Sequence, residues 1–168
     1  MTPPAFSILA VEELLAGKLK AMIQRQHPRD LYDLYRFVGR GTAHDAELLR
    51  KLTVLFYSTL DRDFRTYGWA RFGRIDDEDV RRLLYPLLKA DDRPTSAEMM
   101  AEVEPLLRGA LDHKRESGYL DRMASGTYSP ELLFPGHPEI AERIRQHPAL
   151  VWKAKNVADH LASRRKAR

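Results

Sequence analysis

The apolar side chains of this chain recur mostly at spacings of three and four residues, a period typical of amphipathic helices. Residues 11–26 show one such stripe, made of Leu15, Leu19, Met22 and Ile23. A second pattern starts at Pro28 and has apolar positions at Leu31, Leu34, Tyr35 and Val38. The glycines at 39 and 41 are expected to end it. Two helices joined by a short turn are therefore predicted at 11–26 and 28–38.

The same reading predicts further helices at 44–60, 78–89, 95–116, 138–146 and 148–163. Asp76 and Asp77 can cap the helix at 78, and Thr95 with Glu98 fits a capping box. Pro86 and Pro105 are expected to kink or end the helices that contain them. Residues 117–136 are rich in turn formers and predict a turn-rich segment with a short apolar anchor, ELLF. A strand pattern is found only at residues 6–10. The prediction is a mainly α fold: one domain over 1–168, built as a bundle of six or seven helices with at most a short N-terminal strand.

Composition excludes several classes of protein. The chain has 168 residues, 43% hydrophobic, and suits a globular domain rather than a disordered one. Cysteine is absent, which excludes disulfides, thiolate metal sites and cysteine nucleophiles. No apolar run is long enough for a membrane helix, and the N-terminus lacks the positive start of a secretory signal. A cytoplasmic protein without membrane contact is the expectation.

The net charge of +4 is local. Four basic residues form a tail at 164–168: Arg164, Arg165, Lys166 and Arg168. Without this tail, the chain has 24 basic and 24 acidic residues. Such a tail is either a solvated helix end, which is favoured, or a contact for phosphate groups.

Two further patterns have a structural and a functional interpretation. The three His-Pro pairs, at 27–28, 137–138 and 147–148, each precede a helical pattern, which favours helix caps over metal ligands. No metal site is predicted. The arginine-rich segment 61–77 contains Phe64, Tyr67, Trp69 and Phe72. These rings either stack on bases or a partner, or anchor the segment in the core, and the second is favoured.

Candidate chemistry is concentrated between residues 18 and 33. Lys18 has only apolar neighbours one turn away, at 14, 15, 21 and 22. Its ammonium group must therefore extend outward to water or meet an anion. Asp30 fits the first turn of its helix, where a carboxylate favours the helix dipole. Asp33 can pair locally with Arg29 or Arg36, or across the turn with Lys18. Cations and carboxylates in one cleft are what phosphoryl transfer needs.

Two stretches carry a resemblance to a known family. VEELLAGKLKAMIQRQHPRDLYDLYRF resembles the C-terminal motif shared by the AbiEii/AbiGii-type nucleotidyltransferase toxins, with its KLxAxxxR and RDxxDL elements. GTYSPELLFPGHPEIAERIRQHPALVWKAKNV is similar to the helical C-terminal region of the same proteins.

The resemblance implies a toxin of a toxin–antitoxin or phage abortive-infection system. Such proteins have a polymerase-beta-like core and transfer a nucleotide to an acceptor, in some members tRNA. Mg²⁺ and a nucleoside triphosphate are implied as cofactors. By motif, Lys18 would contact the triphosphate, and Asp33 would act as a base or position the substrate. Asp30 belongs to the same motif with a less defined catalytic role.

The chain departs from the family pattern in two respects. The Gly-Ser turn of the family core does not occur, and the two D-x-D matches, 61–63 and 77–79, follow the lysine motif in helix- or loop-like surroundings. The expectation is the C-terminal half of such an enzyme, inactive unless an N-terminal half is supplied. That half, a cognate antitoxin and tRNA or another RNA are the implied partners. The alternative is a non-catalytic helical module that binds protein or RNA. The nucleotidyltransferase interpretation requires Lys18 and Asp33 to face one cleft.

Overall fold

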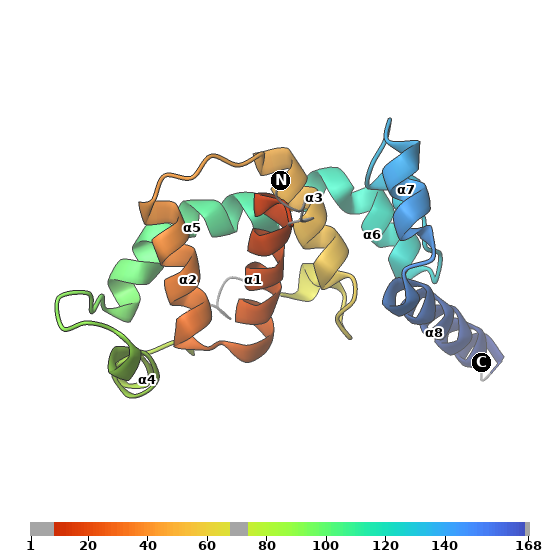
Figure 1. The fold of residues 1–168 in the computed structure, drawn as a ribbon. Coiled ribbons are helices and arrows are strands. Elements are labelled where there is room, and N and C mark those ends of the chain that lie inside the picture. Colours follow the sequence, from red (N-terminus) through yellow and green to blue (C-terminus); the bar gives the residue numbers. More distant parts are fainter. Residues whose placement is uncertain (1–8, 68–73, 167–168) are drawn as a thin grey trace, which may run out of the picture.

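The computed structural model describes residues 9–67 and 74–166, and within these ranges the chain is mainly helical without a strand (Figure 1). The α-helices are α1 (Val11–Arg25), α2 (Pro28–Gly39), α3 (Ala46–Tyr57), α4 (Asp77–Asp79), α5 (Ser96–Leu111), α6 (Ser117–Ala124), α7 (Pro138–Arg145) and α8 (Pro148–Lys166). The predicted mainly α fold is confirmed. Most of the strand predicted at 6–10 lies outside the described residues, and Leu9 and Ala10 have no regular structure.

Helices α1, α2, α3 and α5 form the packed body on the left of Figure 1. α1 and α2 lie side by side as an antiparallel pair, and α5 packs against α2 and α3. The predicted stripes supply the core, because Leu15, Leu19, Met22, Ile23, Leu31 and Leu34 are all buried. Tyr35 and Val38 are only partly buried. Each fully buried side chain of this kind contributes about 1.5–3 kcal/mol.

The turn between α1 and α2 fixes how the two helices meet. Gln26 has a left-handed backbone, with φ of 51°, and its N–H donates to the Met22 carbonyl to end α1. His27 then caps α2, since its Nδ1 accepts from the Arg29 N–H at 3.2 Å, and Pro28 occupies the first helical position. The first His-Pro pair is therefore a cap. His137 lies at the start of α7 without a capping bond from its side chain.

The predicted helix at 78–89 is replaced by three short turns. Asp76 caps the first, α4, by accepting from the Asp79 N–H at 2.8 Å. A π turn, η3 (Val80–Leu84), and a 3₁₀ turn, η4 (Tyr85–Leu87), follow. Pro86 explains the change, because its ring cannot follow a regular helical turn and has no N–H to donate.

Thr95 and Glu98 form the predicted capping box at the start of α5: the Thr95 N–H donates to Glu98 at 2.8 Å, and the Glu98 N–H donates to Thr95 at 3.2 Å. α5 continues through Pro105 and ends at Leu111, before the predicted end at 116. A 3₁₀ turn, η5 (Lys114–Glu116), then leads into α6.

The segment 117–136 was expected to consist of turns, and the first part of that expectation is wrong, because α6 occupies Ser117–Ala124. Tyr119, Leu120 and Met123 are buried on one face of this helix, so tertiary packing outweighs the poor local propensity of its Ser-Gly start. The remainder holds a 3₁₀ turn, η6 (Pro130–Leu132), followed by the expected apolar anchor, Leu133 and Phe134, which are buried.

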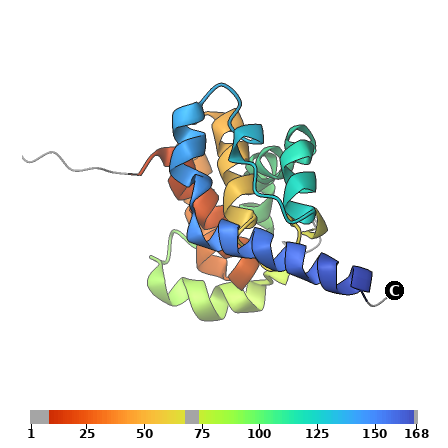
Figure 2. The same cartoon turned by 90° about the vertical axis from the view of Figure 1, so that its right-hand side faces the viewer.

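The C-terminal helices pack to one side of the body, and the end of α8 projects from it in both views (Figures 1 and 2). Residues 159–166 are exposed throughout. Lys153 attaches α8 to the loop after α3 by donating to the carbonyls of Leu60 and Arg62. None of the described helices is both long enough and apolar enough to cross a membrane.

Candidate functional site

A groove of about 590 Å³ runs between α1 and α2. Its floor is apolar and is made by Val11, Leu14, Leu15, Leu34 and Phe37. Its rim is polar and consists of Lys18, Tyr32, Asp33, Arg36, Arg40 and Thr42. The cationic residues lie on both sides, with Lys18 on α1 and the two arginines on the α2 side. An apolar floor with a few converging polar groups is typical of small-molecule sites.

Lys18 and Asp33 meet at this groove. The Lys18 ammonium donates to Oδ2 of Asp33 in an ion pair that joins α1 to α2. The predicted placement in one cleft is confirmed, and the local pairing of Asp33 with Arg29 is not the one formed. The side chains are 47% and 45% exposed, so the pair is worth little for stability and is open to a ligand. The catalytic roles of the two residues remain predictions.

Only two of the four apolar neighbours of Lys18 are buried. Leu15 and Met22 are buried, as the periodicity indicates, but Leu14 is 54% exposed on the groove floor. Lys18 thus lies at the edge of the packed face, where its ammonium both reaches water and meets an anion.

Asp30 lies away from the groove. Its side chain is buried and accepts two hydrogen bonds from Arg25, 2.7 Å from Nη2 and 3.2 Å from Nε. This bidentate contact joins the end of α1 to the first turn of α2. The geometry gives Asp30 a structural task, and its catalytic role stays a prediction that the groove does not support.

The remaining rim residues were not identified from the sequence. Arg36 lies 3.6 Å from Asp92, whose carboxylate also accepts from the Tyr32 hydroxyl at 2.5 Å. Burial, and then the bond to Asp92, raises the pKa of Tyr32. Arg40 forms no ion pair within the described ranges. The available signal was spacing, since Arg36 and Arg40 follow Asp33 by three and seven positions, which places them on one side of α2.

The acidic pairs 61–63 and 77–79 have structural tasks at most of their positions. Asp63 starts the 3₁₀ turn η1 (Phe64–Thr66) by accepting from the Arg65 N–H at 2.9 Å, and it pairs with the Arg65 guanidinium at 2.7 Å. Asp77 accepts from the Ser96 N–H at 2.7 Å, and Asp79 pairs with Arg82. The interpretation of 76–79 as acids of a helix start is confirmed.

The implied Mg²⁺ does not fit the residues of the groove. Within residues 9–67 and 74–166, no three histidine or carboxylate side chains gather as a metal site would require. The groove offers one carboxylate, Asp33, and it is paired with an ammonium. A triphosphate fits better, because the lysine and two arginines of the rim can share its charge.

The aromatic residues of 61–77 that are described serve the core. Phe64 is 3% exposed, and its ring meets Tyr57 edge to face, with centroids 4.8 Å apart. Tyr67 meets the same tyrosine at 5.9 Å. The favoured interpretation as core anchors is confirmed for these two, and Trp69 and Phe72 lie outside the described residues.

Comparison with known proteins identifies the family of the chain. The family model described as nucleotidyl transferase AbiEii toxin, Type IV TA system, matches residues 1–117, and so includes all of α1, α2 and the groove between them. No curated protein and no solved structure matches the chain. Since the matched region exceeds half of the 168 residues, the chain belongs to the AbiEii nucleotidyl transferase toxin family.

Proposed function

We propose that this chain supplies the helical, substrate-holding part of a nucleotidyl transferase and binds a nucleoside triphosphate in the groove between α1 and α2. The observation that carries the proposal is the half-exposed Lys18–Asp33 pair at the rim of that groove. An exposed ion pair adds little to folding, so its two charges are available to a ligand.

The groove has chemically distinct parts that suit the parts of a nucleotide. The apolar floor offers a surface for the base, including the Phe37 ring and the exposed Leu14. Lys18 and Arg40 present cations at the rim for phosphate oxygens. A phosphate that takes over Lys18 releases the Asp33 carboxylate from its ion pair.

The released Asp33 carboxylate has a defined task in the transfer step. It accepts the proton of the acceptor hydroxyl, whose oxygen forms a bond to the α-phosphorus. The bond from that phosphorus to the bridging oxygen breaks, and pyrophosphate leaves. Because the groove does not fit Mg²⁺, the metal-binding carboxylates would come from another segment or polypeptide. Transfer to an acceptor such as tRNA, and control by a cognate antitoxin, belong to the same proposal.

The test is a titration of ATP, GTP, CTP and UTP into the purified protein, followed by calorimetry. Lys18→Met should weaken binding about tenfold or more, because one charged hydrogen bond is lost. Asp33→Asn should bind the triphosphate at least as tightly as the wild type, since it removes a competitor for Lys18. The matched control is Arg29→Gln, which removes an exposed charge of α2 outside the groove. Negligible binding by the wild type, or equal binding by wild type and Lys18→Met, would reject the proposal.

A non-catalytic interaction module is the second candidate, and the observation that favours it lies on α8. Trp152 is 67% exposed, and the projecting end of the helix carries Arg164, Arg165 and Lys166 (Figure 2). An exposed tryptophan and a basic helix end are features of binding surfaces. Loss of partner binding on Trp152→Ala, with nucleotide affinity unchanged, would favour this candidate.

A further inference from the structure

Helix α8 lies outside residues 1–117, the part of the chain that the family model matches. Its first half packs on the rest of the protein, because Leu150 and Ala154 are buried and Lys153 donates to two carbonyls of the loop after α3. Residues 159–166 are exposed throughout and project from the body (Figure 2). A helix held at one end presents the side chains of its free end at a fixed spacing.

The charge of α8 is strongly positive. One carboxylate, Asp159, stands against five cationic side chains: Lys153, Lys155, Arg164, Arg165 and Lys166. All of these cations except Lys153 are exposed, and the exposed four form no ion pair with the residues that the structure describes. Exposed arginines of the body such as Arg25 and Arg82 face a carboxylate instead. The basic helix end at 164–166 is therefore available to an anionic partner.

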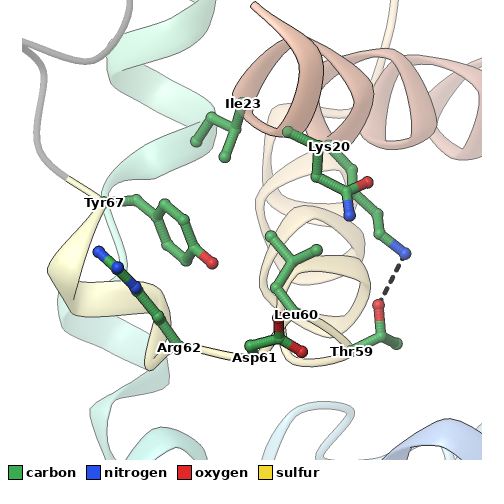
Figure 3. A pocket seen from close by; sticks show the side chains of 8 residues that line it. Lys20, Ile23, Thr59, Leu60, Asp61, Arg62 and Tyr67 are labelled. Carbon is green, nitrogen blue, oxygen red and sulfur yellow. Dashed lines mark hydrogen bonds between the residues drawn. The ribbon is translucent and has the colours of Figure 1, made fainter.

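Cations elsewhere in the protein do not gather in this way. A pocket of about 330 Å³ beside α1 contains both Lys20 and Arg62. Lys20 donates to Thr59 at 2.7 Å, and Arg62 lies at the opposite end of the pocket and points away from it (Figure 3). Tyr67 and Leu60 lie between the two cations. That pocket therefore has no cation cluster comparable to the end of α8.

An exposed aromatic ring lies on the same helix, and helical spacing determines its neighbours. Trp152 is 67% exposed, and Lys155 and Asn156 follow it by three and four positions, so both lie beside the indole ring. Lys166 ends the same face, about 21 Å further along the helix axis. We call this surface the Trp152 face; all of its residues are exposed: Trp152, Lys155, Asn156, Asp159, Ser163 and Lys166.

The surroundings of Trp152 suit a nucleic-acid base better than a protein or a membrane. The core of a protein interface is depleted in charged residues, and a helix that lies on a membrane has a broad apolar face. The Trp152 face has one large apolar side chain, and Val151, which is also exposed, lies about 100° away around the helix. A base needs a single ring for stacking, and a cation next to that ring can contact the phosphate. Stacking of this kind requires an unpaired base, which favours a single strand over a duplex.

We propose that the Trp152 face binds a single nucleic-acid strand. One base stacks on Trp152, the phosphate next to it contacts Lys155, and the strand continues toward Lys166 and the basic helix end. Asp159 lies between these cations and repels the strand, which limits the affinity. The inference rests on the second of the two proposed functions, for which it names the partner, and it does not depend on the groove.

The test is a fluorescence anisotropy titration of the full-length chain into a labelled single strand of about 12 nucleotides. The wild type should bind it saturably, and Trp152→Ala should weaken binding about tenfold or more, because the stacked base is lost. Trp152→Phe should bind more tightly than Trp152→Ala, since a ring remains. Thermal unfolding of each variant shows whether the fold is retained. Equal affinities of the wild type and Trp152→Ala, or the absence of saturable binding by the wild type, overturn the proposal.

The salt dependence of binding tests the phosphate contacts. Lys155→Gln and Lys166→Gln should each reduce the slope of log affinity against log salt concentration by about 0.7, the value for one phosphate contact of a single strand. The matched control is Arg29→Gln, which removes an exposed cation of α2 and should leave the slope unchanged. Asp159→Asn should tighten binding, because a repelling charge is lost. A slope that none of the α8 variants changes overturns the assignment of the phosphates.

Two further probes separate a strand from other polyanions. A duplex of the same sequence and polyglutamate of similar length should both bind more weakly than the single strand, and Trp152→Ala should not change their affinity. If either binds as tightly as the strand does, the surface recognises charge alone and the proposal is overturned. Trp152→Ala should also keep the ATP affinity of the wild type. Loss of strand binding at full ATP affinity therefore concerns α8, whereas loss of ATP binding concerns the function proposed for the groove.

Discussion

Arg50 of α3 and Glu116 of η5 form an ion pair that is almost entirely removed from solvent. The Arg50 Nε lies 3.0 Å from one carboxylate oxygen of Glu116 and 3.1 Å from the other, and the side chains are 12% and 4% exposed. The pair joins the helical body to the segment that leads into α6. Burying two charges is costly, so the pair holds the fold only while both partners are present.

Glu116→Ala should therefore lower the free energy of unfolding by about 3 kcal/mol, since it leaves the Arg50 charge buried and unpaired. Chemical denaturation measures this change. The double variant Arg50→Met with Glu116→Leu should recover most of the loss, because it removes both buried charges. A Glu116→Ala protein as stable as the wild type would contradict the structural role of the pair.

Gly126 makes a close contact with α8 that no larger residue can reproduce. Its φ is +82°, and a Cβ at this position would lie 2.7 Å from the backbone N and Cα of Ala158. Gly126→Ala should lower the free energy of unfolding by about 2–4 kcal/mol, from the left-handed backbone and the clash together.

Gly136 is the matched control, because it has the same φ of +82° but no atom within 4 Å of the added Cβ. Gly136→Ala should lower the free energy of unfolding by only about 1–2 kcal/mol, the cost of the left-handed backbone alone. The difference between the two variants in chemical denaturation measures the contact between Gly126 and α8. Equal losses would mean that α8 moves aside without cost.

The sequence predicted the parts of the fold that local chemistry determines. The stripe of α1, the cap at His27 and Pro28, and the capping box of α5 each depend on residues a few positions apart. Helix α6 was missed for the opposite reason: its start contains Gly118, and it is held by distant contacts of Tyr119 and Leu120. The π turn before Pro86 was missed as well, because a proline predicts a disturbance and not its geometry.

Some features of the candidate site were likewise predictable from the sequence, and others were not. The pairing of Lys18 with Asp33 was predictable, because a tight turn between two antiparallel helices sets which of their residues face each other. The exposure of Leu14 was not, since it depends on which other elements cover that side of α1. Arg40 follows Asp33 by seven positions, so spacing on α2 could have indicated it. The pocket beside Lys20 joins α1 to the loop after α3, and spacing does not reveal a contact between elements that distant in sequence.

The start of α3 should respond to acid through Asp45. The Leu48 and Glu47 N–H groups donate to its carboxylate and lower its pKa below the ordinary 3.8. The folded state therefore binds this proton less readily than the unfolded state does. The resulting stabilisation is fully present above pH 3.8 and is lost as the pH falls through the lower, folded-state pKa.

Asp45→Asn removes this titration while keeping an oxygen that can cap the helix. The stability advantage of the wild type over Asp45→Asn should thus shrink as the pH falls from about 6 to about 2.5. Denaturation at several pH values, with both proteins in the same buffers, provides the measurement. A difference that stays constant over this range would show that the carboxylate charge does not matter at the cap.

Asp30 and Asp33, one turn apart on α2, should respond to the same substitution in opposite ways. Asp30 is buried and accepts both hydrogen bonds of Arg25, so Asp30→Asn should lower the free energy of unfolding by about 1–2 kcal/mol and leave nucleotide affinity unchanged. Asp33 is half exposed, so Asp33→Asn should change stability by less than about 0.5 kcal/mol. In the complete transferase, however, Asp33→Asn should abolish nucleotide transfer. Chemical denaturation and a transfer assay, run on both variants, separate the two roles. If Asp30→Asn lost transfer activity while keeping full stability, Asp30 and not Asp33 would be the reacting carboxylate.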